Sequence, residues 1–548
     1  MKKYFLFACI FFCLQVYPCT NFLVGKGASI DGSTMVTYSA DSYSLYGELY
    51  FWPGSRHDSG MMLDVREWDT GKYLGRIAQE TETFNVVGNM NEHQLCIGET
   101  TWGGRSELSD STGLIDYGSL IYITLQRAKT AREAIKIMTD LVKEYGYYSS
   151  GESFSIVDKD EVWIMDMIGK GSGSRGAVWV AVRIPDDCIS AHANQARIHL
   201  FPLHDPENCV YSEDVISFAR EKGYFEGRDE DFSFAGAYNP VEWSGLRFCE
   251  ARVWSFFNRW SDGADRWLPY IFGNDTEPMP LYIRPKRKLG VRDLMSSMRD
   301  HYEGTPFDPS NDVAAGPFHS PYRLSPITWG VDGERYIFER PVSTQQTAFT
   351  FVSQMRSFLP DIVGGVLWFG VDDACFTVYN PIYPCLSRVP ECYRVGNGDF
   401  EHFSWTSSFW IHNWVANMAY SRYDQVLPYA VALQDRLEGG YLENQATIEG
   451  EALELCLTDR DRAVNFLTEY SISSAQTAID EWKRFGEYLV VKFMDGAVKR
   501  EVDGRFERNE HGGSQYPDRP TFDDDFLRRI VREKGDWLRD GGPAFDKD

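Results

Sequence analysis

The chain has 548 residues, 43% of them hydrophobic, and a formal net charge of −25. This length exceeds what one hydrophobic core usually supports, so we expect one large domain with an appended region. The negative charge argues against nucleic acid and anionic membrane surfaces as partners.

The first 18 residues have the pattern of a secretory leader. Lys2 and Lys3 precede an apolar stretch, residues 4–16, that only Gln15 interrupts. The stretch is too short to span a bilayer but has the length of a signal-peptide core, the alternative being a buried N-terminal helix. We therefore leave residues 1–18 out of the fold and expect an exported protein, periplasmic or extracellular. No later stretch is long and apolar enough to cross a membrane.

The cysteines agree with export. Two of the eleven lie in the leader, and beyond Cys19 eight remain, an even number that permits disulfides in an oxidising compartment. Cys385 and Cys392 flank a short loop that contains proline and are the best candidate pair. No two cysteines have zinc-ribbon spacing, so the sequence predicts no metal cluster.

A hairpin is predicted directly after Cys19. Residues 20–28 are extended and rich in apolar side chains, Asp31-Gly32 is a turn signal, and residues 35–39 run back. If the chain reverses near residue 30, counting along the strands places Cys19 beside residues 41–42. This would bring Asp41 near Cys19, although Asp41 could also simply cap the end of the hairpin.

Further along, the pattern predicts one helix and three more pairs of strands. Residues 127–146 form an amphipathic helix that begins with a capping box from Thr130 and Glu133. We expect hairpins of 153–157 with 162–168, of 177–184 with 189–193, and of 365–370 with 375–379. Antiparallel hairpins with helices between them favour an α+β layered domain over a βαβ fold. From residue 409 the pattern is helical, and the charged tail after residue 504 is expected to be partly loose.

Several short motifs resemble chemical signatures but are better explained by structure. Residues 171–176, Gly-Ser-Gly-Ser-Arg-Gly, match a dinucleotide fingerprint, yet a strand follows where that motif needs a helix. The acidic pairs Asp186-Asp187 and Asp372-Asp373 lie in predicted turns, which accounts for them better than glycosidase chemistry. The sequence has no GxSxG elbow, no Walker lysine loop and no HExxH helix.

Cys19, directly after the leader, has three interpretations: a structural or disulfide cysteine, a lipoprotein anchor, or an N-terminal nucleophile. The residues before it, Val-Tyr-Pro, lack the small residue usual before a lipidated cysteine, and a strand follows at once. A thiol titrates at about 8.5 and an α-amine at about 7.7–8.0, so the amine of the same residue can accept the thiol proton. It can then protonate the leaving amine. We favour the nucleophile.

Eight stretches, taken together and in order, carry a more specific signal. They are residues 19–26 (CTNFLVGK), 31–35 (DGSTM), 89–92 (NMNE), 98–104 (GETTWGG), 151–154 (GESF), 191–198 (AHANQARI), 343–347 (STQQT) and 368–373 (WFGVDD). Over residues 19–420 the chain thereby resembles the dipeptidase A family of N-terminal-nucleophile (Ntn) cysteine hydrolases.

The resemblance implies a four-layer αββα sandwich, in which two antiparallel sheets stack between helical layers and the nucleophile begins a central strand. It implies hydrolysis of dipeptides with broad side-chain tolerance and without a metal or other cofactor. Cys19 carries over as the nucleophile, Asp41 as the aspartate near the N-terminal amine, and Asn194 as an amide near the oxyanion. Asn194 could instead be a turn former at a strand end.

Two further residues are candidates for binding the substrate. Glu99 could bind the free ammonium group of a dipeptide, or it could be the structural partner of an arginine. Arg197 could pair with the substrate carboxylate, for which arginine geometry is suited, or it could belong to a structural salt bridge.

We therefore expect a leader (1–18), an Ntn catalytic domain (19–405) and a helical C-terminal extension with a loose tail (406–548). Pro18 departs from the small residue favoured at a signal-peptidase junction, so an upstream cut with later trimming is an alternative. Competing functions are an Ntn amidase of N-acyl substrates, such as bile-salt or penicillin amides, and a non-enzymatic binding module anchored by a lipid on Cys19. The sequence leaves open whether the protein is a homo-oligomer.

Overall fold

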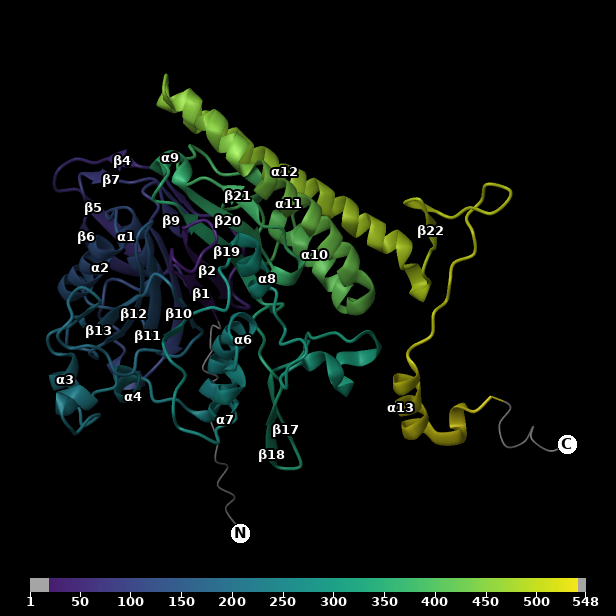
Figure 1. The fold of residues 1–548 in the computed structure, drawn as a ribbon, viewed down its shortest axis with the longest axis horizontal. Coiled ribbons are helices and arrows are strands. Elements are labelled where there is room, and N and C mark those ends of the chain that lie inside the picture. Colours follow the sequence, from purple (N-terminus) through teal and green to yellow (C-terminus); the bar gives the residue numbers. More distant parts are fainter. Residues whose placement is uncertain (1–18, 541–548) are drawn as a thin grey trace, which may run out of the picture.

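The computed structural model describes residues 19–540, so the predicted leader, residues 1–18, lies outside the described residues. The fold is α+β, with two large sheets in which every neighbouring pair of strands is antiparallel (Figure 1). The seven-stranded sheet has the order β16 (Tyr282–Ile283), β14 (Ile189–His192), β1 (Asn21–Val24), β2 (Thr34–Asp41), β19 (Thr347–Met355), β20 (Gly365–Val371), β21 (Asn380–Ile382). The eight-stranded sheet has the order β15 (Cys209–Tyr211), β13 (Ala177–Ile184), β12 (Val162–Gly169), β11 (Gly151–Val157), β10 (Cys96–Gly103), β9 (Met90–Asn91), β8 (Val86–Val87), β3 (Phe51–Trp52).

The central strands are buried on both faces, which explains why their sequences are nearly continuous apolar runs. In β1, Leu23 packs into the core between the sheets, whereas Phe22 and Val24 pack outward against α6 (Ala251–Trp260) and α8 (Val291–Met298). The eight-stranded sheet buries its other face under α1 (Tyr117–Leu125) and α2 (Ala131–Tyr145). The two sheets meet where β2 contacts β10 and β11.

The predicted amphipathic helix is confirmed as α2. The Thr130 hydroxyl accepts from the Glu133 amide at 3.2 Å, and Gly146, at φ 81°, ends the helix. The helix begins at residue 131 rather than 127, because the preceding residues close α1, a helix that the sequence analysis did not predict.

Two of the four predicted hairpins are confirmed and two need correction. β1 pairs with β2, and β11 pairs with β12. The predicted hairpin of 177–184 with 189–193 is wrong: β13 belongs to the eight-stranded sheet and β14 to the seven-stranded one, so the turn at Pro185–Asp187 carries the chain between sheets. β20 pairs with β21 at 380–382 rather than 375–379, because Ala374–Phe376 forms a 3-10 turn.

The predicted disulfide is also wrong. All nine cysteines of the described residues are free thiols. Cys385 packs with the helices outside the seven-stranded sheet, and its Sγ donates to the Ile362 carbonyl at 3.4 Å. Cys392 packs into the core between the sheets. The short loop thus sends the two side chains to different cores.

The predicted C-terminal helices are confirmed as α10 (Ser408–Tyr420), α11 (Tyr423–Cys456) and α12 (Arg460–Lys492), which lie together along one side of the sheets (Figure 1). Two buried ion pairs, Arg356 with Glu449 and Arg299 with Glu438, fasten α11 to the strand region. Beyond them, β22 (Glu501–Val502), β23 (Arg505–Phe506) and α13 (Asp524–Lys534) lie away from the main body, and α13 buries no residue.

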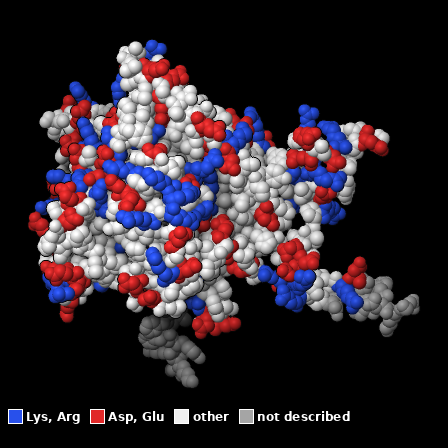
Figure 2. Space-filling model, viewed as in Figure 1, with Lys and Arg blue, Asp and Glu red and all other residues white. Residues whose placement is uncertain are grey.

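The smaller elements lie at the edges of this framework. They are β4 (Ser55–Arg56) paired with β7 (Glu82–Thr83), β5 (Met62–Arg66) with β6 (Tyr73–Ala78), β17 (Thr328–Val331) with β18 (Glu334–Ile337), and the helices α3 (Val215–Glu221), α4 (Phe234–Tyr238), α5 (Trp243–Gly245), α7 (Leu268–Ile271) and α9 (Asp361–Gly364). Among the described helices, none has the length and apolar character needed to cross a bilayer. Acidic and basic side chains are interspersed on the face in Figure 2, so the excess negative charge does not form one uniform acidic surface there.

Candidate active site

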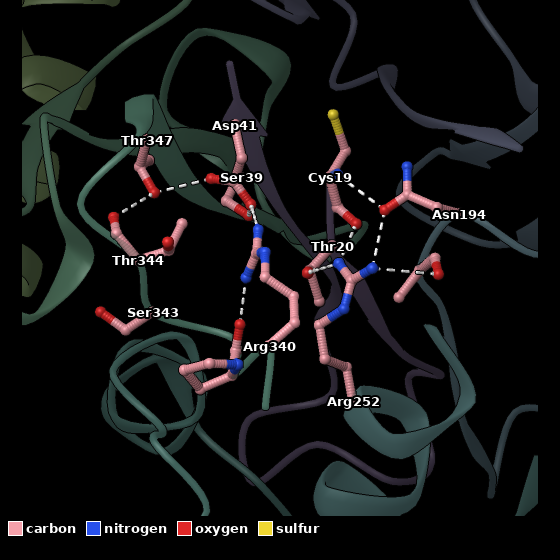
Figure 3. Close-up of polar contacts among 12 residues, drawn as sticks. Cys19, Thr20, Ser39, Asp41, Asn194, Arg252, Arg340, Ser343, Thr344 and Thr347 are labelled. Carbon is pink, nitrogen blue, oxygen red and sulfur yellow. Dashed lines mark hydrogen bonds and ion pairs between the residues drawn. The ribbon is translucent and has the colours of Figure 1, made fainter. Parts of the chain in front are cut away.

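Cys19 lies at the start of β1, a central strand between β14 and β2, and its side chain is only 4% exposed. Thr20 bridges Ser39 across the hairpin, which places Cys19 next to Ala40. Counting along the strands predicted residues 41–42 as the neighbours of Cys19, which is one residue beyond the observed neighbour, Ala40. Figure 3 shows the sulfur on the side of Cys19 opposite to Arg252.

The Cys19 nitrogen is held by Asn194, which follows β14. It donates to Asn194 Oδ1 at 2.9 Å, and Arg252 Nη2 donates to the same oxygen at 2.8 Å. Since both partners can only donate, the amide oxygen must face them, and Asn194 Nδ2 then donates to the Thr101 carbonyl at 2.7 Å. Asn194 has φ 60°, a conformation that asparagine tolerates well. In the uncleaved chain this Cys19 nitrogen is the amide after Pro18; cleavage there would make it the α-amine.

Arg252, on α6, is a residue of the site that the sequence analysis missed. Its Nη1 donates to the Cys19 carbonyl at 2.6 Å and to Thr20 Oγ1 at 2.8 Å, while Nη2 also reaches the Ala193 carbonyl at 3.3 Å (Figure 3). The guanidinium thus ties the start of β1 to the end of β14. No signal in the sequence singles out Arg252, because Arg247 and Glu250 are also charged within the same aromatic-rich stretch, 246–257.

Asp41, at the end of β2, is fully buried, and its carboxylate points to a second arginine. Oδ2 accepts from Arg340 Nη2 at 2.8 Å and from Ser39 Oγ at 3.2 Å, and Oδ1 accepts from Thr347 Oγ1 at 2.6 Å (Figure 3). Burial raises the pKa of Asp41, and Arg340 and Thr347 oppose that shift. The hydrogen bonds of the Asp41 carboxylate thus go to Arg340, Ser39 and Thr347 rather than to Cys19.

The thiol faces a tyrosine and a glutamate. Cys19 Sγ lies 3.8 Å from the Tyr38 hydroxyl and 3.7 Å from Glu99 Oε1, and Tyr38 donates to the same Glu99 oxygen at 2.5 Å. Burial, followed by the charges of Glu99 and Asp41, raises the pKa of the Cys19 thiol well above its usual value, while the Asp41 N–H and the Tyr38 hydroxyl oppose the rise. The resting thiol is therefore protonated and needs a base to become a nucleophile.

The two candidate substrate-binding residues have different surroundings. Glu99 contacts Tyr38 and Cys19, and it forms no ion pair with an arginine among residues 19–540. The structure therefore does not support the alternative that Glu99 is the structural partner of an arginine. Arg197 is buried and ion-paired with Glu250, and its Nη2 donates to the Pro280 carbonyl at 2.7 Å. This arrangement favours the structural salt bridge that the sequence left open for Arg197. Within the described part of the chain, no cluster of three or more His, Cys, Asp or Glu side chains could hold a metal ion.

A buried thiol at the start of a central strand, with two buried arginines that fix the strand ends around it, is compatible with the site of a cysteine hydrolase. The chain matches the family described as Peptidase family C69 over residues 18–51 and 52–435. It therefore belongs to peptidase family C69, a family of cysteine peptidases, and the resemblance to the dipeptidase A family is confirmed.

The relatives carry related names. The chain is 24% identical to the "Probable dipeptidase" of Latilactobacillus sakei over 75% of this chain and 82% of the relative. It is 26% identical to the "Probable dipeptidase" of Salmonella dublin over 70% of this chain and 85% of the relative. It is 24% identical to the "Dipeptidase A" of Lactobacillus helveticus over 74% of this chain and 82% of the relative.

Proposed function

We propose that the mature protein is an exported Ntn cysteine dipeptidase of broad specificity in which Cys19 is the N-terminal nucleophile. The observation that carries the proposal is the position of Cys19: its nitrogen is held by Asn194 at 2.9 Å, and its sulfur lies at the start of a central strand. The family match begins at residue 18, directly before Cys19, and the relatives are named dipeptidases. The leader pattern of residues 1–18 supports export, and broad specificity rests on the family resemblance.

The arrangement of secondary structure supports an Ntn four-layer sandwich. The two sheets face each other through β2, β10 and β11. Helices α1 and α2 cover the outer face of the eight-stranded sheet, and α6 and α8 cover that of the seven-stranded sheet. Because the family match extends to residue 435, inside α11, the proposed end of the catalytic domain at residue 405 stays a prediction.

The proposed reaction begins when removal of residues 1–18 turns the Cys19 nitrogen into an α-amine. The neutral amine accepts the thiol proton, and the thiolate attacks the peptide carbonyl carbon. The resulting ammonium protonates the leaving amine as the peptide C–N bond breaks, which leaves a thioester on Cys19. Water then hydrolyses the thioester, with the amine as base, and restores the thiol. The raised pKa of the resting thiol is the reason that this internal base is needed.

The surrounding residues hold the reacting atoms in place. Asn194 Oδ1 accepts from the Cys19 nitrogen and so orients the amine, a task that the sequence analysis gave to Asp41. Arg252 fixes both Asn194 Oδ1 and the Cys19 carbonyl, which limits the freedom of the chain end. The Asp41 carboxylate holds Arg340, and its negative charge raises the pKa of the Cys19 thiol. We therefore propose Asn194 and Arg252 as the residues that position the amine.

The test compares Cys19→Ala with Cys96→Ala in secreted protein. Cys96 is another buried thiol of the core between the sheets and is not part of the site. Intact mass should show a free Cys19 at the N-terminus, and only Cys19→Ala should lose dipeptide hydrolysis while both variants fold. Full activity in Cys19→Ala, or working protein that keeps residues ahead of Cys19, would overturn the proposal. A diacylglyceryl adduct on Cys19 would instead support the lipoprotein alternative, and hydrolysis confined to N-acyl amides the amidase alternative.

A further inference from the structure

Two buried glutamates converge beside the Cys19 thiol. Glu99 on β10 and Glu152 on β11 are each 1% exposed. The strands pair with Thr101 opposite Glu152, so Glu99 and Glu152 are diagonal neighbours on one face of the sheet. Thr101 Oγ1 donates to Glu152 Oε1 at 2.9 Å, and the charge of Glu99 raises the pKa of Glu152.

The glutamate pair is incompletely satisfied. Oε2 of Glu99 and Oε2 of Glu152 are both buried and find no hydrogen-bond donor among residues 19–540. In that part of the chain, no arginine, lysine or histidine forms an ion pair with either carboxylate. The groups that act on the pair are acidic or neutral: Cys19, Tyr38 on β2, Asp69 between β5 and β6, Tyr117 on α1 and Tyr147 after α2.

Two carboxylates buried together cannot both ionise at low cost. Burial raises the pKa of Glu99 to about 7 and that of Glu152 well above its usual value, and their mutual repulsion adds to the rise for Glu152. The pair therefore keeps protons at a pH where isolated glutamates have lost them, and a cation beside it would favour its ionisation. A buried negative charge without a cationic partner is costly, and a cationic ligand would relieve that cost.

We propose that the Glu99–Glu152 pair binds the free α-ammonium group of the peptide substrate and thereby restricts cleavage to the first peptide bond. This inference rests on the proposed role of Cys19 as the nucleophile. It assigns Glu152 to the site, a residue of the stretch 151–154 that was not among the candidate site residues predicted from the sequence.

The distance between the thiol and Glu99 matches the dimensions of an N-terminal residue. Cys19 Sγ and Glu99 Oε1 are 3.7 Å apart. In an amino-acid residue the nitrogen is about 2.5 Å from its own carbonyl carbon, as bonds of about 1.46 and 1.52 Å at about 111° require. With 3.7 Å between the sulfur and the carboxylate oxygen, an ammonium about 2.8 Å from Glu99 can be placed with that carbon about 3–3.5 Å from the sulfur, a distance suited to attack. The next carbonyl lies about 3.8 Å further along the chain and out of reach.

The bound ammonium would also activate the thiol. Glu99 is the largest charge that raises the pKa of Cys19, and a cation on Glu99 offsets that effect. A peptide with a free amino terminus therefore helps to generate the thiolate that attacks it. An N-acylated substrate carries no such charge, so the pair distinguishes a dipeptidase from an N-acyl amidase.

The kinetic test uses mature protein with L-alanyl-L-alanine and its N-acetyl derivative. The double variant Glu99→Gln/Glu152→Gln keeps the shapes of both side chains and removes the charge of the pair, and we expect KM for the free dipeptide to rise about 10²-fold with a much smaller change in kcat. Asp166→Asn is the matched control, because Asp166 is a buried carboxylate of the same sheet that accepts from the Arg197 and Ile198 amides. We expect it to lower stability without changing the preference for the free amine. Hydrolysis of trialanine that releases an intact N-terminal dipeptide would overturn the inference.

A second measurement does not depend on turnover. L-alaninol, an amine without a carbonyl, should slow the alkylation of Cys19 by iodoacetamide in the wild type, whereas N-acetyl-L-alaninol should not. Glu99→Gln/Glu152→Gln should lose this protection. Equal protection of the wild type and the double variant, or equal hydrolysis of the free and N-acetylated dipeptides, would refute the ammonium site. Retained alaninol protection in a protein that hydrolyses no peptide would refute the proposed function while supporting the site.

Discussion

Replacing Arg252 by methionine removes the group that joins the nucleophile to Asn194 while keeping most of the side-chain volume. Arg252 donates four hydrogen bonds outside its own helix, three of them at 2.6–2.8 Å, to Cys19, Thr20 and Asn194. The fourth, to the Ala193 carbonyl, measures 3.3 Å. The variant leaves the Cys19 carbonyl and one acceptor direction of Asn194 Oδ1 without this donor.

The size of the effect follows from these contacts. Hydrogen bonds from a charged donor are worth about 1.5–3 kcal/mol each, and the desolvation penalty of the buried guanidinium offsets part of their sum. We expect Arg252→Met to lower the free energy of unfolding by about 3–5 kcal/mol. A displacement of about 1 Å at the reacting nitrogen lowers a rate about 10²-fold, so kcat should fall by about this factor with little change in KM.

The control is Arg197→Met. Arg197 is equally buried, but it is ion-paired with Glu250 and donates to the Met279 and Pro280 carbonyls, away from the Cys19 carbonyl that Arg252 holds. Both variants should lose stability in urea unfolding, whereas only Arg252→Met should lose kcat for a dipeptide when rates are corrected for the folded fraction. If Arg252→Met keeps kcat within about threefold of the wild type, or if Arg197→Met loses as much, the positioning argument is wrong.

Three further predictions concern the chemistry and stability of the site. Hydrolysis should persist in EDTA and disappear on alkylation of Cys19; a loss in EDTA that zinc restores would contradict this. The pKa of Glu99 is about 7 in the folded protein against an ordinary 4.5, so the folded protein keeps a proton that the unfolded chain loses. The free energy of unfolding therefore falls as the pH rises from about 4.5 to about 7, by about 3 kcal/mol for this group. The free energy of unfolding, measured in urea at several pH values, should depend less steeply on pH in Glu99→Gln than in the wild type. An unchanged pH dependence would refute the raised pKa assigned to Glu99. A Cβ at Gly98 would lie 2.3 Å from Asn21 Oδ1, so Gly98→Ala should lower the free energy of unfolding by about 1–3 kcal/mol. The control is Gly440→Ala in helix α11, whose Cβ meets no atom within 4 Å and which should be neutral or stabilising. Equal melting temperatures of the two variants would contradict the clash.

Much of the local structure could be predicted from the sequence. The β1–β2 hairpin, the β11–β12 hairpin, the capped helix α2 and the C-terminal helices follow patterns of apolar side chains and turn residues a few positions apart. The errors share one cause. A continuous apolar run shows that both faces of a strand are buried, but it does not show which sheet the strand joins, and so β14 was paired with β13 instead of β1.

The same distinction holds for the site. The sequence by itself singled out Cys19, because a leader pattern and a strand meet at that residue, and it placed Asp41 near Cys19 by counting along one hairpin. Only the tertiary structure brought Asn194, 175 positions away, to the Cys19 nitrogen and Arg252, 233 positions away, to its carbonyl, and only it set Glu152 beside Glu99. Hydrogen-bonding groups so far apart in the chain meet because two sheets and a helix pack together, and short-range patterns in the sequence carry no record of that packing.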